Sequence, residues 1–185
     1  MRLHPETKNQ NRRLLLNGAA HSALASTGIR FVPVEHSGCS QKSEEEGRAI
    51  RDMFDSLMRQ RYSDREGNVH PFGMESILVV APYNVQVNYL KSILPAGARV
   101  GTVDKFQGQE AEVVLISMTT SSAEDLPRNI EFLYSKNRLN VAISRARCLA
   151  VVVANPRLLE IPCQTVEQMQ LVNTLCRTAG ELLSD

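Results

Sequence analysis

The run AEVVLISM, residues 111–118, decides the fold class of this 185-residue chain. Two other runs, SILVVA (76–81) and CLAVVVA (148–154), are likewise short and continuously apolar. A strand with one solvated face alternates apolar and polar residues, whereas a continuous apolar run is typical of a strand buried on both faces. The three runs therefore predict the middle strands of a parallel sheet that is covered by helices on both sides.

Helical patterns separate these runs, and this alternation predicts a doubly wound α/β fold. The clearest is the amphipathic segment 43–62, which opens with a serine cap and an acidic turn and ends in a basic turn. Residues 1–28 have no clear pattern, although 11–28 would suit a short helix and a loop. The remaining predictions are helices at 84–94, about 135–146, 155–160 and 164–178, strands at 29–35 and 98–101, and a loop at 63–73.

The composition indicates one globular domain. Hydrophobic residues make up 43% and charged residues 22%, and the net charge of +1 neither favours nor excludes a nucleic-acid partner. No signal peptide opens the chain and no apolar run approaches the roughly 20 residues of a membrane span, so we expect a cytoplasmic protein without a membrane partner. The four cysteines (Cys39, Cys148, Cys163, Cys176) show no metal-ligand spacing, which predicts reduced thiols and no metal site.

Several catalytic motifs are missing. The sequence has no G-x-x-x-x-G-K-[ST] phosphate loop, and none of its apolar runs ends in the Asp-Glu pair that holds Mg²⁺. It also lacks the G-x-S-x-G motif of serine hydrolases. This chain alone therefore has no apparatus to hold a nucleoside triphosphate and its metal ion.

The stretch NRLNVAISRAR (137–147) carries three arginines among core residues. In a continuous helix, Arg138 and Arg145 are two turns apart, so they lie nearly above one another beside an apolar stripe. They either bind a ligand at the edge of the sheet or pair with carboxylates. Arg147 falls near or past the helix end and is left open between nucleotide, carboxylate and solvent.

Two further stretches follow predicted strands. In GTVDKFQGQEAEVVLIS (101–117), polar residues crowd a turn before a buried strand, and Gly108 permits a positive φ there. This stretch is either a polar turn or part of a site. In VVAPYNVQVNYL (79–90), Tyr83 and Gln86 follow the carboxyl end of a strand, where Tyr83 either packs or stacks on a base.

In order along the chain, APYNVQ (81–86), TVDKFQGQEAEVVLIS (102–117) and NRLNVAISRAR (137–147) resemble motifs IV, V and VI of superfamily 1 helicases. The likeness is to the branch of the nonsense-mediated-decay helicase, and RLHPE (2–6) resembles the segment after motif III. The residues FVPVEHSG (31–38), EEEGRAI (44–50) and 147–177 resemble bacterial proteins that join a RecB-like nuclease domain to such a helicase. The resemblance implies a RecA-like fold of the P-loop NTPase type over residues 1–185, with its core at 29–160 and a C-terminal helix at 161–185.

The resemblance further implies that this is the second RecA-like domain of an ATP-dependent helicase or translocase, inactive alone. ATP and Mg²⁺ are then held mainly by a first RecA-like domain of the same polypeptide, which is the principal partner. Arg145 matches the arginine finger and Arg138 a second basic residue of motif VI. The positions that match nucleotide-binding residues are Glu110, Gly108, Gln107, Tyr83 and Gln86.

Thr102, Asp104 and Lys105 match positions that couple the nucleotide cleft to the nucleic-acid track. The implied ligand is single-stranded nucleic acid, DNA rather than RNA, held mainly through its phosphates. The alternative is a non-catalytic module that binds nucleic acid or protein with the same fold. A nuclease centre needs clustered carboxylates, and VDK (103–105) lacks them, so any RecB-like nuclease domain of the parent protein lies outside these residues.

Overall fold

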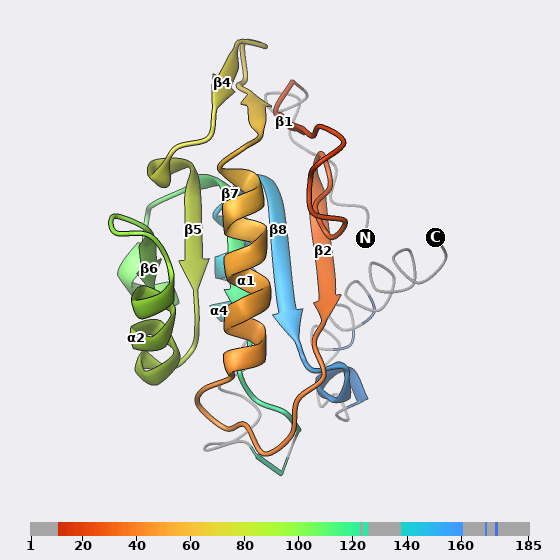
Figure 1. Ribbon diagram of the computed structural model, residues 1–185, viewed down its shortest axis with the longest axis vertical. Coiled ribbons are helices and arrows are strands. Elements are labelled where there is room, and N and C mark those ends of the chain that lie inside the picture. Colours follow the sequence, from red (N-terminus) through yellow and green to blue (C-terminus); the bar gives the residue numbers. More distant parts are fainter. Residues whose placement is uncertain (1–10, 123, 126–137, 161–168, 170–172, 174–185) are drawn as a thin grey trace.

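The computed structural model describes residues 11–122, 124–125, 138–160, 169 and 173. Their centre is a five-stranded sheet in which all neighbouring strands are parallel, as the apolar runs predicted (Figure 1). In spatial order the strands are β2 (Gly28–Pro33), β8 (Ala146–Ala154), β7 (Ala111–Ser117), β5 (Ile77–Val80) and β6 (Arg99–Gly101). This is the α/β, RecA-like sheet that the sequence predicted.

Both faces of the sheet are covered. Helices α1 (Glu44–Leu57) and α2 (Asn84–Ile93) lie over one face, and α4 (Arg138–Ser144) lies over the other with the short 3₁₀ helices η3 (Val103–Phe106) and η4 (Pro156–Glu160). Strand β7 shows why its sequence is apolar throughout, because Val113 and Leu115 enter one core cluster while Val114 and Ile116 enter the other.

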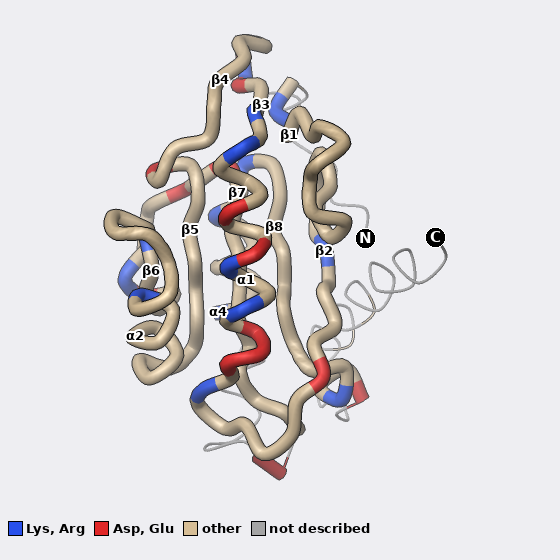
Figure 2. The backbone as a smooth tube through the Cα atoms, viewed as in Figure 1, with Lys and Arg blue, Asp and Glu red and all other residues tan. Residues whose placement is uncertain are grey.

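Helix α1 begins where the sequence predicted, because the Ser43 side chain accepts a hydrogen bond from the Glu46 backbone N–H at 3.1 Å. Acidic and basic residues follow one another in groups along α1 (Figure 2), and the exposed pairs Arg48–Glu45 and Arg51–Asp55 lie 3.8 and 3.9 Å apart. It ends at Leu57 rather than at residue 62, so the predicted basic last turn is wrong. The N–H of Gln60 bonds to the Leu57 carbonyl, and Arg61 already starts a strand.

That strand belongs to a small antiparallel sheet that the sequence did not predict. Strands β1 (Arg13–Leu15), β3 (Arg61–Ser63) and β4 (Val69–Pro71) lie in the order β1-β3-β4. The predicted short helix within 11–28 is therefore wrong, and the predicted loop at 63–73 contains the end of β3 and all of β4. The Tyr62 ring packs against two other rings and so stabilises the small sheet. Its centroid lies 5.1 Å from the centroid of the Phe72 ring and 5.4 Å from that of the His70 ring.

Helix α4 ends at Ser144, earlier than the end at about residue 146 that the sequence predicted. The Arg145 carbonyl accepts from the Ala111 N–H at 3.1 Å, so the chain has joined β7 and continues as β8. The predicted helix at 155–160 is the 3₁₀ helix η4. The predicted helix at 164–178 and the segment 161–185 lie outside the described residues, apart from Met169 and Asn173, as do residues 1–10.

Cys39 and Cys148 are free thiols, whereas Cys163 and Cys176 lie outside the described residues. Within the described ranges, no helix has the length and apolar character needed to cross a membrane.

Candidate functional site

The predicted site residues lie at two opposite edges of the parallel sheet. Arg138 opens α4 beside the carboxyl ends of the strands, and Arg145 follows α4 beside their amino ends. The sequence placed the two side chains nearly above one another on a continuous helix. Helix α4 instead ends at Ser144, and Arg145 lies beyond it against β7, so each arginine serves its own edge.

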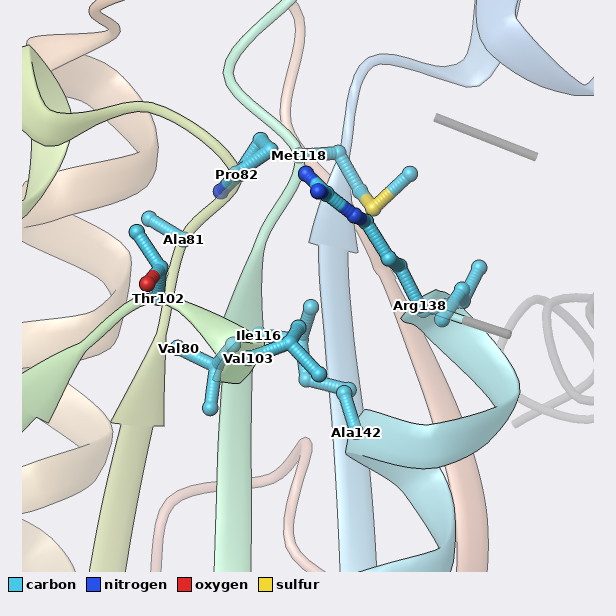
Figure 3. Close-up of a pocket in the computed structure, with 10 residues that line it drawn as sticks. Val80, Ala81, Pro82, Thr102, Val103, Ile116, Met118, Arg138 and Ala142 are labelled. Atoms are coloured by element: carbon cyan, nitrogen blue, oxygen red, sulfur yellow. The ribbon is translucent and has the colours of Figure 1, made fainter. Parts of the chain in front are cut away.

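The carboxyl edge contains a pocket, where strands β5, β6 and β7 end. Two polar side chains, Thr102 and Arg138, stand among apolar ones, and the Arg138 side chain extends from the start of α4 toward Met118 (Figure 3). Ligands of doubly wound folds bind at this edge. The lining residues are Val80, Ala81, Pro82, Thr102, Val103, Ile116, Met118, Arg138, Leu139 and Ala142.

The turn after β6 brings Thr102, Asp104 and Lys105 to this edge, as the sequence predicted. An Asp104 carboxylate oxygen lies 3.5 Å from a guanidinium nitrogen of Arg138, so the acid positions a neighbouring cation. The Lys105 ammonium donates to the Val100 carbonyl at 3.1 Å and lies 5.7 Å from the centroid of the Phe106 ring. The edge therefore presents one hydroxyl and two cations, of which Lys105 is turned back onto its own turn.

The amino edge brings together Arg145, Gln107, Gly108 and Glu110. Gly108 has φ +76°, a left-handed conformation that favours glycine, and Gln107 and Glu110 are exposed beside it. Two backbone bonds fix Arg145, since its N–H donates to Ala142 and its carbonyl accepts from Ala111. Within the part of the chain that the structure describes, no carboxylate pairs with Arg145, and its buried Nε has no hydrogen-bond partner. The backbone of Arg145 is therefore fixed, and its guanidinium is available for an anion.

A carboxylate that the sequence analysis missed organises the neighbouring charges. Glu112 is only 4% exposed. One of its oxygens lies 3.0 Å from a guanidinium nitrogen of Arg12 and 3.3 Å from one of Arg147, and the other accepts from the Cys148 thiol at 3.2 Å. Arg147 also donates through Nε to Glu110 at 3.0 Å. Arg147, whose partner was left open, therefore binds two carboxylates.

The electrostatics of this cluster follow from these contacts. The hydrogen bond to Glu110, and then the one to Glu112, raise the pKa of the Arg147 guanidinium. Burial, and then the negative charge of Glu112, raises the pKa of the Cys148 thiol. The only sequence signal for the cluster was a single acid inside an apolar run, with Arg147 at the same end of the adjacent strand.

Tyr83 and Gln86 do not join the amino edge. Both are buried near the carboxyl end of β5, at the start of α2. The Gln86 amide accepts from the Ser43 N–H at 3.0 Å and donates to the Ser43 carbonyl at 2.9 Å and to the Ser117 hydroxyl at 3.1 Å. These bonds engage its side chain fully in the core, so the structure does not bring it to a nucleotide at the surface.

Comparison with known proteins adds a family. The sequence profile of the family described as "AAA domain" matches residues 6–157. "Putative helicase mov-10-B.2" of Danio rerio is 30% identical over 150 residues, which are 69% of this chain and 15% of that protein. "Probable RNA helicase armi" of Drosophila melanogaster is 37% identical over 98 residues, 47% of this chain and 8% of that protein.

A third relative is "DNA polymerase alpha-associated DNA helicase A" of Saccharomyces cerevisiae, 38% identical over 90 residues, 46% of this chain and 13% of that protein. The matched part of this chain thus corresponds to at most 15% of the length of any of these three relatives.

Proposed function

This chain belongs to the AAA domain family and is a RecA-like domain of the superfamily 1 helicase type, and from that premise we propose that it is the second motor domain of an ATP-dependent helicase or translocase. One observation carries the proposal. Arg145 is fixed by its backbone at the amino edge, and its guanidinium has no acidic partner among the described residues. An arginine of this kind suits an anion supplied by another domain.

The proposed anion is the γ-phosphate of ATP. In-line transfer of this phosphoryl group to water spreads negative charge over its oxygens, and an arginine supplied from across a cleft stabilises that charge by roughly 10³–10⁵ in rate. Arg145 has that role in the proposal. Exposed Glu110, held by Arg147, and the turn at Gln107 and Gly108 contact the sugar and phosphates.

In this proposal a first RecA-like domain binds most of the ATP and the Mg²⁺ ion. The sequence has no phosphate loop, and the described residues offer no group of three His, Cys, Asp or Glu side chains that could hold a metal ion. The donors at the amino edge therefore fit a site that is completed by another domain. Closure of the two domains on ATP and their release after hydrolysis would then drive movement.

The carboxyl edge is proposed to hold the strand through phosphates, with Thr102, Lys105 and Arg138 as donors. Single-stranded DNA is the proposed ligand, on the resemblance to bacterial nuclease-helicase proteins. RNA is the alternative, since relatives named as RNA helicases match this chain as well. Competition between the two strands in a binding assay decides between them.

The test uses a protein that joins this chain to a first RecA-like domain. Replacing Arg145 with alanine should lower strand-stimulated ATP turnover by about 10³-fold or more and leave ATP affinity within a few-fold. Arg48→Ala is the control, because Arg48 lies on the exposed side of α1. Loss of ATP binding would instead make Arg145 structural. Turnover by the isolated chain would contradict the proposal, and strand binding without any ATP dependence would favour a non-catalytic module.

A further inference from the structure

A network of buried polar side chains lies beneath the carboxyl edge, outside the proposed nucleotide site. It joins the segments that follow β2, β7 and β8 to the starts of α1 and α2. All of these side chains or residues are at most 2% exposed. The members are His36, Ser43, Glu46, Gln86, Ser117, Thr119, Ser121 and Asn155.

Glu46 is the centre of this network. Its Oε1 lies 2.9 Å from Nε2 of His36, and its Oε2 accepts from the Ser117 hydroxyl at 2.6 Å and from the Thr119 N–H at 2.8 Å. Removing a carboxylate from water is costly, and a buried pair of this kind is weak evidence for stability because well-packed apolar residues often serve as well.

The backbone leaves the extended conformation two residues after β7 ends. Thr119 has φ +67°, a left-handed conformation that is strained for a β-branched residue. The Thr119 hydroxyl donates to the Met118 carbonyl at 2.6 Å, and its backbone N–H is the group that Glu46 binds. The carboxylate therefore holds in place a backbone conformation that the sequence itself disfavours.

His36 also holds the segment that follows β7, through Ser121. Its Nδ1 lies 2.7 Å from the Ser121 hydroxyl, which also accepts from the Cys39 N–H at 2.9 Å. The Ser121 N–H donates to the Cys39 carbonyl at 2.9 Å. Residues 119–121 are thus bound both to Glu46 and to the segment that follows β2.

Met118, the residue that follows β7, also lines the pocket. Met118 is the last residue before the left-handed turn, and its thioether lies beside the Arg138 side chain in the view of Figure 3. We propose that Glu46, together with His36, is a positioning residue that fixes the turn at Thr119 and so sets Met118 in the pocket beside the strand-binding donors. The consequence for strand binding rests on the proposed function, whereas the placement of Met118 does not.

The first readout is the ε-methyl NMR signal of Met118 in the 185-residue chain, labelled at its methionine methyl groups and assigned with Met118→Leu. Glu46→Gln keeps the size of the side chain and removes the charge that three groups share. The Met118 signal should shift and narrow as the side chain leaves its packed position. Glu44→Gln, an exposed acid on the same helix, is the matched control and should leave the signal unchanged.

The second readout is the affinity for a labelled single-stranded oligothymidylate, measured well below the melting temperature of each variant. Glu46→Gln should weaken binding by about fivefold to tenfold, as for the loss of one or two side-chain contacts. Removal of a negative charge alone would strengthen binding to a polyanion, so weakening points to altered geometry. Ser117→Ala should reproduce a smaller Met118 shift if Glu46→Gln does not fold.

A folded Glu46→Gln variant with an unchanged Met118 signal would overturn the proposal, even if its melting temperature fell, because Glu46 would then only stabilise the core. The two proposals fail separately. If the wild-type chain does not bind the strand but Met118 moves in the variant, strand binding is wrong and the positioning role stands. If the strand binds and Met118 does not move, the positioning role is wrong.

Discussion

Replacing Glu112 with alanine should strongly destabilise the chain. Glu112 lies in the middle of a charge cluster at the amino edge, and its side chain is only 6% exposed. It bonds to Arg12, Arg147 and the Cys148 thiol. The substitution leaves the Arg12 guanidinium, which is 17% exposed and has a buried Nε without a hydrogen-bond partner, with no acid beside it among the described residues.

The magnitude follows from how much of each cation stays in water. Breaking a buried ion pair by removing one partner costs about 3–5 kcal/mol. Arg147 is 42% exposed and keeps Glu110 at 3.0 Å, so most of the loss falls on Arg12. We therefore expect a cost of about 3 kcal/mol for alanine, and of about 1–2 kcal/mol for glutamine, which keeps one acceptor oxygen.

Urea unfolding of the chain, followed by circular dichroism, measures this cost. With a slope of about 3 kcal/mol per molar urea, the midpoint of Glu112→Ala should fall by about 1 M, and its melting temperature by about 6–12 °C. Asp55→Ala is the control, because Asp55 pairs with Arg51 at 3.9 Å on the exposed face of α1, and it should cost less than about 1 kcal/mol. Equal costs for the two alanine variants would refute the reasoning.

Three further outcomes are expected. Gly47→Ala should destabilise the chain by about 1–2 kcal/mol in urea unfolding, because its Cβ would overlap the tyrosine ring of α2 and overpacking outweighs the gain in helix propensity. In peptide mapping after brief alkylation, Cys39 should be modified before Cys148, whose burial raises its thiol pKa. The hydrogen bond from His70 lowers the pKa of Asp64 to about 2, so NMR titration of His70→Ala should find that pKa rising toward 3.8. The stabilisation by Asp64 should be present above about pH 4 and lost as the pH falls through about 2.

The central sheet followed from the sequence because burial on both faces leaves a strong pattern. The runs 76–81, 111–118 and 148–154 each became a strand of the predicted kind. The small sheet was missed because its strands have three residues each, too few to show alternation. Pairing across about 50 residues of chain defines β1 and β3, and no local pattern records such pairing.

The site residues at the carboxyl edge were predictable for a different reason. Parallel strands bring their carboxyl ends together, so the residue after β6 had to lie near the end of β5, and Thr102 lines the pocket with Ala81. Glu112 was not predictable in this way. One partner of its carboxylate, Arg12, is 100 residues away in the sequence, and that contact depends on where β1 lies.

The segment 137–147 shows how one wrong helix end changes the chemistry inferred. A spacing of seven residues places two side chains on one face only while the helix continues. Here the helix ends at Ser144 because the Arg145 carbonyl meets the N–H of Ala111 on β7, a partner that helical periodicity does not include. Apolar residues occur on both sides of the helix end, since Leu139 and Ala142 pack from α4 and Ala146 packs against the same cluster as the first residue of β8. The strand pairing therefore separates Arg138 from Arg145, and it assigns one arginine to the pocket edge and the other to the edge with Glu110.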